Sequence, residues 1–362
     1  MLQRIGTALL VWFALFDLLH DWRGARWLPA QLRGLGGVVG IWAAVRLARA
    51  GGAGLGLLLL TFPLALSLQL ALATLRNRHL NPRDLLAEGT TATRTLTRVE
   101  IPVRHGTTPA LHLVPPQGAQ AVVCVAHGSG SDKYFYTWET SAMLLARGFA
   151  VLLIDLDGHG ASDRPQAYPH TAESLSDVLL WLRSRYARVG VIGKSLGGCI
   201  ATHAAAHGAS LDALVVIGSP PALQLTRAQV RREARGLLRY AILRQLRYGS
   251  VVQLVRAWTT TPKQRTLIAT EDLIARLDLC GSLHHIGQSL TRLPVLLIYG
   301  TADALVPPTA VDQVDAAKPA WAVLYRLKRG THLSTMVDPR TLRLVGAWLT
   351  LKLHPTTPSE YS

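Results

Sequence analysis

Six short, uninterrupted apolar runs constrain the fold of this 362-residue chain more than any other feature. They occupy residues 121–126, 150–154, 189–192, 214–217, 295–299 and 322–325. Strands exposed on one face alternate apolar with polar residues, whereas strands buried on both faces read as continuous apolar runs. Helical patterns, such as the one at 171–185, lie between most of the runs. The sequence therefore predicts an α/β fold, with a mostly parallel sheet covered by helices on both faces and with the reactive side chains following the strands' carboxyl ends.

One strand end carries a candidate nucleophile. The run at 189–192 leads into Gly193-Lys194-Ser195-Leu196-Gly197, a G-x-S-x-G motif between a predicted strand and a predicted helix. In that context the serine sits on a sharp turn that lifts its hydroxyl above the sheet, and the flanking glycines permit the strained, closely packed backbone. The motif predicts that Ser195 is a catalytic nucleophile. The alternative is a tight structural turn.

A nucleophilic serine needs a base, and the base needs a carboxylate to orient it. Asp303 follows the run at 295–299, and His332 follows the run at 322–325. Taken singly, Asp303 could stabilise a turn and His332 could be a surface histidine. Because both follow strand ends, in the chain order Ser, Asp, His, we predict a catalytic triad of Ser195, Asp303 and His332.

Acyl transfer at a serine also requires donors for the oxyanion. The backbone N–H of Leu196 is the first candidate, because it follows the nucleophile at a predicted helix N-terminus. The second candidate is the backbone N–H of Ser129, in the loop His127-Gly128-Ser129-Gly130 after the first run. We expect His127 itself to be a buried structural histidine.

These residues together resemble the α/β-hydrolase superfamily, and within it the branch of monoglyceride lipases, lysophospholipases and serine aminopeptidases. The resemblance covers about residues 94–350 and rests on His127-Gly128, on 147–151, on 155–163, on the Ser195 motif, on the Asp303 segment and on His332. It implies a two-step hydrolysis through an acyl-enzyme, with no metal or organic cofactor, and a structural role for the turn 158–160. Two features depart from the family pattern. Lys194 replaces the histidine often found before the nucleophile, and one insertion is rich in arginine.

The N-terminal region has the pattern of membrane segments. Residues 51–75 carry no charge, are rich in leucine and are flanked by arginines. About 20 apolar residues suffice to span a bilayer. Two shorter uncharged stretches, 5–16 and 34–45, are marginal spans or interfacial helices. We therefore predict a membrane-anchoring helical region at 1–80, with one to three spans, followed by a hydrolase domain at 81–362.

The orientation follows from arginine counts. With three spans, the positive-inside rule places the hydrolase domain on the cytoplasmic side of the membrane. With the last span alone the counts nearly balance, and the domain could face outward. Three cysteines do not make a disulfide framework, which favours the cytoplasm.

About 70 residues separate the runs at 214–217 and 295–299, where one crossover helix would suffice. We predict an inserted helical cap at about 222–291. Its first part holds many arginines interleaved with apolar residues, and Glu233 is the single acid among them. This pattern is typical of helices that lie on anionic lipid head groups, although a solvated helix face is the alternative. The net charge of +16 comes without a nucleic-acid-binding signature, so we expect no nucleic-acid partner.

The sequence thus predicts a membrane-anchored serine hydrolase that cleaves a carboxylic ester, lipid-like or amphiphilic in character. An acyltransferase, thioesterase or peptidase of the same fold is the alternative, because the choice of acyl acceptor is not readable from the motifs. A non-catalytic membrane scaffold is a third hypothesis.

Overall fold

The computed structural model describes residues 86–134, 137–224, 226, 228–229, 232–233 and 265–353. The predicted membrane region at 1–80 lies outside these residues, as does most of the arginine-rich part of the predicted cap. Within the described part of the chain, no helix is long and apolar enough to cross a membrane. The predicted spans and their boundary with the hydrolase domain therefore stay predictions.

The described strands form one nine-stranded sheet in the order β1-β2-β3-β5-β4-β6-β7-β8-β9. Pairing is antiparallel from β1 to β5 and parallel from β5 to β9. The strands are β1 (Gly89–Thr90), β2 (Thr95–Val103), β3 (Gly106–Val114), β4 (Ala121–Ala126), β5 (Ala150–Ile154), β6 (Arg188–Lys194), β7 (Ala213–Ile217), β8 (Val295–Gly300) and β9 (Val323–Leu327). Strand order reverses at β4, between β5 and β6. In open α/β sheets such a reversal marks the crevice where ligands bind.

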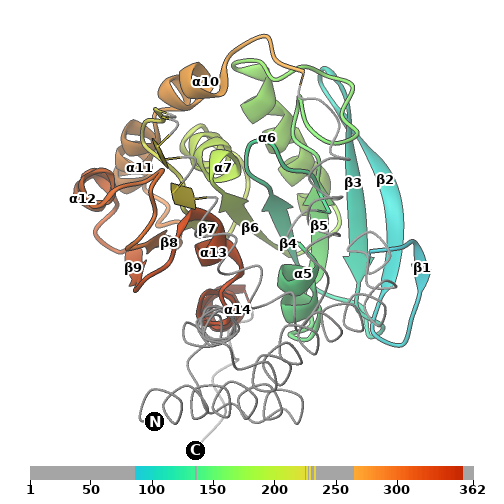
Figure 1. The fold of residues 1–362 in the computed structure, drawn as a ribbon. Helices are drawn as coiled ribbons and strands as arrows, with labels where there is room; N and C mark the ends of the chain where they lie inside the picture. The colour runs from blue at the N-terminus through green and yellow to red at the C-terminus, as the bar shows by residue number, and fades with distance from the viewer. Residues whose placement is uncertain are drawn as a thin grey trace, which may run out of the picture. The chain divides into compact units, whose positions relative to one another are not determined.

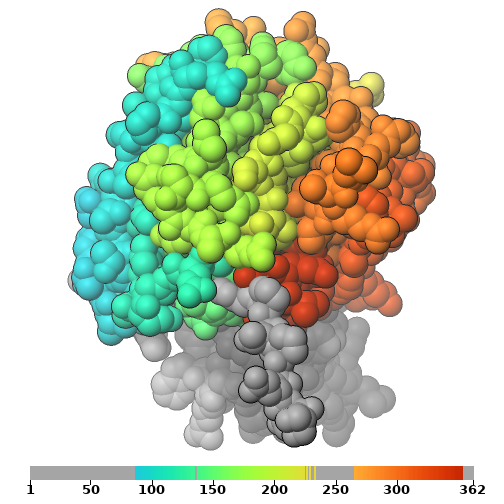
Figure 2. Space-filling view, turned by 180° about the vertical axis from the view of Figure 1, so that it is seen from behind, coloured from blue at the N-terminus to red at the C-terminus, as the bar shows by residue number. Residues whose placement is uncertain are grey.

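Helices cover both faces of this sheet (Figure 1). They are α5 (Trp138–Leu145), α6 (His170–Arg183), α7 (Leu196–Ala206), α10 (Thr270–Leu277), α11 (Leu279–Gln288), α12 (Pro308–Ala317), α13 (His332–Val337) and α14 (Pro339–Leu353). On one face α7 contacts α6, α10 and α11, while on the other α5 contacts α14. Figure 2 shows the outer surface of the α6 and α11 layer, with α6 in green and the α10–α11 segment in orange. The predicted parallel sheet between two helical layers is confirmed.

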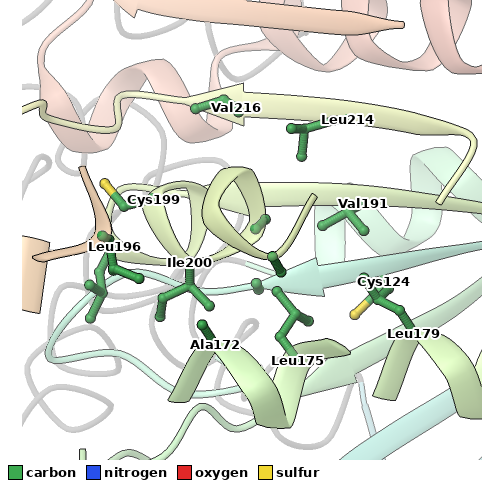
Figure 3. Close-up of a cluster of buried hydrophobic side chains, with 14 of the residues drawn as sticks. Cys124, Ala172, Leu175, Leu179, Val191, Leu196, Cys199, Ile200, Leu214 and Val216 are labelled. Atoms are coloured by element: carbon green, nitrogen blue, oxygen red, sulfur yellow. The ribbon is translucent and has the colours of Figure 1, made fainter. Parts of the chain in front are cut away.

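Alternate residues of the continuous apolar strands face the two layers, so both faces are buried. All six residues of β4 are buried, and so are all five of β5. Cys124 and Val191 belong to a core that also includes Leu175 of α6 and Ile200 of α7 (Figure 3). Gly190 faces the opposite layer, where the side chains of α14 fill the space beside it. Burial on both faces explains the lack of polar residues in β4 and β5. The run at 322–325 differs, because it forms β9 at the edge of the sheet, where Val323 and Tyr325 are exposed.

Two helices that fall within the predicted cap range belong to the main core. Leu273 and Leu277 of α10, and Leu283 and Ile286 of α11, are buried in the same cluster as the strands. The helix α11 also lies against α12. These helices thus provide the crossover from β7 to β8 that a parallel sheet requires.

The helix α7 approaches the strand ends so closely that side chains are excluded. A Cβ on Gly193 would lie 2.7 Å from the carbonyl oxygen of Gly197 and 2.7 Å from the nitrogen of Gly198. A Cβ on Gly197 would meet the backbone of Ala126 at the end of β4. Since these neighbours are backbone atoms, they cannot rotate away. The first turn of α7 is therefore seated directly on the ends of β4 and β6.

This contact predicts that Gly193→Ala destabilises the fold. Overpacking against backbone costs about 1–3 kcal/mol in the free energy of unfolding. Gly287→Ala is the matched control, because its Cβ would meet only ordinary contacts with Pro319 at 3.6 Å or more. Alanine is the better helix former, so the control should unfold at the same temperature or slightly higher. Thermal unfolding of both variants measures this, and an unchanged Gly193→Ala melting temperature would contradict the close contact.

Candidate active site

Ser195 sits at the turn between β6 and α7 in a backbone conformation that few residues adopt. Its φ is 51° and its ψ is −119°, which for a residue with a side chain costs about 1–3 kcal/mol. The N–H of Ser195 donates to the carbonyl of Ile217 (2.9 Å). Its own carbonyl accepts from the hydroxyl of Ser219 (2.7 Å) and from the N–H of Gly198 (2.9 Å). These hydrogen bonds hold the strained turn in place.

The structure brings together the three residues predicted to form the triad. Nε2 of His332 lies 3.0 Å from Oγ of Ser195, and Nδ1 of His332 lies 2.8 Å from Oδ2 of Asp303. Ser195 follows β6, Asp303 follows β8, and His332 follows β9. Because a carboxylate can only accept, Nδ1 carries the proton toward Asp303, and Nε2 is left to accept the proton of the serine hydroxyl.

Local hydrogen bonds fix the two partners of Ser195. The second carboxylate oxygen of Asp303, Oδ1, accepts from the N–H groups of Leu305 (2.8 Å) and Val306 (2.9 Å). His332 is the first residue of α13, behind a capping box in which Thr331 and Ser334 bond each other's backbone N–H. Both Asp303 and His332 are buried, at 5% and 4% exposure. The imidazole of His332 is therefore fixed at two points. The capping box holds its backbone, and the immobilised carboxylate of Asp303 holds Nδ1.

The environment of His332 raises the pKa of its imidazole above the ordinary value of 6.5. Burial by itself lowers this pKa. The charge of Asp303, its hydrogen bond to Nδ1 and the charge of Glu233 act in the opposite direction and outweigh the burial. The surroundings of His332 therefore favour the protonated form of its imidazole.

Of the two predicted oxyanion donors, Leu196 lies at the start of a helix and Ser129 lies in an exposed loop. Leu196 is the first residue of α7, and the N–H groups of a helix's first turn have no acceptor within the helix. Ser129 is exposed, and its hydroxyl lies 3.3 Å from that of Thr270 at the start of α10. Between them, Gly128 approaches the nucleophile so closely that a Cβ there would be 3.1 Å from Cβ of Ser195. The loop after β4 thus passes directly beside Ser195, and the role of its N–H groups stays a prediction.

A buried ion pair ties this loop to the neighbouring strand end. Asp155, at the end of β5, is fully buried and pairs with the ammonium group of Lys133. The same carboxylate accepts from the backbone N–H of Lys133 (2.8 Å) and of Ala161 (2.7 Å). The pair therefore connects the loop that passes Ser195 with the glycine-rich turn after β5. The segment 155–163, which carries part of the family resemblance, contains Asp155, but its sequence does not indicate this ion pair.

Two further histidines, His127 and His159, are buried near the site. His127 is buried, its Nδ1 bonds the carbonyl of Gly128 (2.8 Å), and its Nε2 accepts from the N–H of Leu156 (3.1 Å). Burial lowers its pKa. His159 lies with its ring 5.2 Å from that of His127, and burial lowers its pKa to about 4. With these contacts His127 has no ring nitrogen left to act as a base.

Lys194 and Glu233 complete the surroundings of the triad. Lys194 points to α5, where its ammonium donates to the hydroxyl of Thr140 (3.1 Å), and burial lowers its pKa to about 8. Glu233 is also buried, and its carboxylate bonds the backbone beside Asp303 and at His332. No motif in the sequence indicates that Glu233 belongs to the site. Its one signal was that it stands alone as an acid in an arginine-rich segment.

In the described part of the chain, one group of side chains has spacing suited to a metal ion. It consists of His105, His170 and Glu173, whose potential ligand atoms lie within 4.8 Å of one another. The guanidinium of Arg104 already lies 3.5 Å from the carboxylate of Glu173. A metal ion would have to compete with this charge, and we assign no metal to the group.

Curated proteins similar to this chain include an esterase. The pimeloyl-[acyl-carrier protein] methyl ester esterase of Vibrio cholerae is 26% identical over 248 residues, which covers 62% of this chain and 91% of that protein. An uncharacterised protein of Mycobacterium tuberculosis is 26% identical over 327 residues, covering 80% of this chain and 88% of that protein.

Solved structures with the same fold include two further esterases. An esterase of Pyrococcus furiosus aligns with a TM-score of 0.52 at 20% identity, covering 75% of this chain and 94% of that one. An esterase of Exiguobacterium antarcticum aligns with a TM-score of 0.51 at 15% identity, covering 70% of this chain and all of the other. At these identities the likeness establishes the fold, and it confirms the predicted α/β-hydrolase architecture.

The family comparison covers both the strand ends and the reactive residues. Residues 117–333, more than half of the chain, match the family described as serine aminopeptidase, S33. The matched range begins just before β4 and ends just after His332, so it contains all three residues of the predicted triad. The chain therefore belongs to the serine aminopeptidase S33 family of the α/β-hydrolase superfamily.

Proposed function

We propose that this protein is a serine hydrolase that cleaves carboxylic esters. The observation that carries the proposal is the hydrogen-bonded series from Ser195 through His332 to Asp303, with distances of 3.0 Å and 2.8 Å. Family membership supports the reaction class, and the similarity to the pimeloyl-[acyl-carrier protein] methyl ester esterase of Vibrio cholerae favours an ester as the substrate.

The reaction follows from the positions of the three side chains. His332 accepts the proton of the Ser195 hydroxyl through Nε2, and the serine oxygen attacks the ester carbonyl. Asp303 keeps the imidazole oriented and offsets its positive charge. The N–H groups of Leu196 and Ser129 stabilise the oxyanion. The imidazolium then protonates the leaving alcohol, and a water molecule, activated by the same histidine, hydrolyses the acyl-enzyme.

We further propose that the enzyme is membrane-anchored, with its catalytic domain on the cytoplasmic side, and that its substrate is a lipid-like or amphiphilic ester. The support is in the sequence, where residues 51–75 form an uncharged, leucine-rich stretch and arginines crowd the segment after β7. An anchored domain lies close to the bilayer in which such esters dissolve. The arginines would lie near anionic lipid head groups, where each contributes about 1 kcal/mol to binding.

Replacing the nucleophile tests the reaction. Ser195→Ala should abolish hydrolysis of a short-chain aryl ester, because triad knockouts in serine hydrolases reduce turnover by about a millionfold. Ser184→Ala, at an exposed position after α6, is the matched control and should retain full activity. A fluorophosphonate probe should label the wild type and the control but not Ser195→Ala. Near-normal hydrolysis by purified Ser195→Ala would exclude the proposed nucleophile.

The acidic limb of the pH–rate profile reports on the base. His332 acts as a base only when it is neutral, so kcat/KM should decline as the pH falls through the pKa of this residue in the free enzyme. Because its surroundings raise that pKa, the midpoint of the decline should lie above pH 6.5. The profile of ester hydrolysis measured from pH 5 to 9 gives the midpoint. A midpoint clearly below 6.5 would contradict the electrostatic environment described here.

Fractionation of cells tests the membrane anchor. The full chain should sediment with membranes and resist extraction by alkaline carbonate, because a span of about 20 apolar residues leaves the bilayer only with detergent. A variant that begins at Asn81 should remain in the soluble fraction and still react with the fluorophosphonate probe. Recovery of the full chain in the soluble fraction would rule out the anchor without affecting the assignment of Ser195.

A further inference from the structure

Glu233, which is not part of the predicted triad, has a buried carboxylate beside the loops that carry Asp303 and His332. Glu233 is 7% exposed and comes from the segment between β7 and α10, far along the chain from Asp303 and His332. Its Oε1 accepts from the N–H of Ala304 (2.7 Å), and its Oε2 accepts from the N–H of His332 (3.1 Å). Each carboxylate oxygen thus binds a different strand-end loop.

The two N–H groups belong to the loops that carry the triad. Ala304 directly follows Asp303 in the loop after β8, and His332 follows β9. The Glu233 carboxylate therefore cross-links these loops through their backbones. Asp303 fixes the ring of His332, while Glu233 fixes the backbone from which the ring projects. A side chain that only packed in the core would not need both oxygens.

The burial of this charge needs a compensating interaction. An ionised carboxylate removed from water is stable only when hydrogen bonds or opposite charges replace its hydration. Among the described residues, the replacements for Glu233 are two backbone N–H groups, together with the imidazole of His332. Every one of these groups belongs to a triad loop. The position of Glu233 thus depends on the triad loops, and they in turn depend on it.

We propose that Glu233 is a positioning residue for the reaction, whose carboxylate holds the loops of Asp303 and His332 in register and places a second negative charge beside the imidazole. The inference rests on the proposed hydrolase function. Glu233 acts through His332 and needs no contact with the substrate.

The charge of Glu233 has a measurable consequence for His332. Among the described residues, the ionisable groups that face the imidazole are Asp303, from the loop after β8, and Glu233. Both charges raise the pKa of His332 against the effect of burial. Glu233 in turn faces His332 and Asp303, and burial together with the charge of Asp303 raises its own pKa. Loss of the Glu233 charge should therefore lower the pKa of the catalytic base.

Glu233→Gln separates this proposal from a purely structural role. Glutamine keeps the size of the side chain, but it loses the charge and turns an NH₂ group toward one of the two backbone N–H groups. The acidic limb of kcat/KM should move to lower pH by about one unit, as expected when one neighbouring charge is removed. Misplacement of the imidazole should also lower kcat by about tenfold. A residue that only stabilised the fold would leave the midpoint of the pH profile in place.

Glu233→Asp provides the complementary variant. It keeps the charge, but its shorter side chain cannot reach both N–H groups, so kcat should fall while the midpoint stays near that of the wild type. Glu100→Gln, an exposed position on β2 and four strands from β6, is the matched control for loss of one carboxylate. It should change neither quantity. All measurements use the full chain, with the melting temperature of each variant recorded.

The outcomes distinguish this inference from the proposed function. If Ser195→Ala is inactive and a folded Glu233→Gln has the wild-type pH midpoint, the positioning role is wrong and the hydrolase assignment stands. If Glu233→Gln does not fold, Glu233→Asp decides, since wild-type kcat in that variant overturns the proposal. If Ser195→Ala retains activity, the proposed function itself fails.

Discussion

The seating of helix α7 on the ends of β4 and β6 is the constraint on which the active site depends. Gly193, Gly197 and Gly198 let two backbones meet with no side chain between them. This contact leaves the chain one way to turn from strand into helix, and Ser195 takes the strained conformation that the turn requires. The hydroxyl therefore projects above the sheet edge, and the first N–H groups of the helix lie directly behind it. The positions of the proposed nucleophile and of the proposed oxyanion donor at Leu196 thus both result from one packing contact.

Around this turn, buried carboxylates organise the other loops. Asp155 binds the loop after β4, Asp303 binds both His332 and its own loop, and Glu233 joins the loops after β8 and β9. In each case backbone N–H groups donate to the carboxylate, so the negative charge orders main chain rather than side chains alone. The loops that connect strands and helices are generally the most mobile parts of a fold. Here the loops after β4, β8 and β9 are each bound by a buried carboxylate.

Much of this architecture was predictable because its causes are local in sequence. The continuous apolar runs gave β4 and β5 with the bounds that the structure shows, since a strand buried on both faces has no room for a polar residue. The turn at Ser195 could be predicted because it requires glycines at a fixed spacing. Asp303 and His332 could be proposed because they follow strand ends, although the distances that join them depend on the whole sheet.

Other parts of the site have no local signal. Nothing in the neighbourhood of Glu233 indicates that its two acceptor atoms meet loops about 70 and 100 residues further along the chain. The pairing of Lys133 with Asp155 is similarly remote, and it depends on β4 and β5 being neighbours. The bounds of the inserted segment were also difficult to predict. The helices α10 and α11 are amphipathic, and an amphipathic helix has the same sequence pattern whether it belongs to a cap or packs on the main core. Contacts of this kind arise from topology.

The buried pair of Lys133 and Asp155 also limits how this sequence can change over time. Removing either partner alone leaves an uncompensated buried charge, at a cost of about 3–5 kcal/mol. Replacing both by apolar residues would in addition leave the two backbone N–H groups that donate to Asp155 without an acceptor. The stability of a typical domain is only about 5–15 kcal/mol, so a single substitution consumes much of the margin. Substitutions at Lys133 and Asp155 are therefore coupled during evolution. Both the loss of one partner and the loss of both are therefore costly, and related sequences should keep the two charges together.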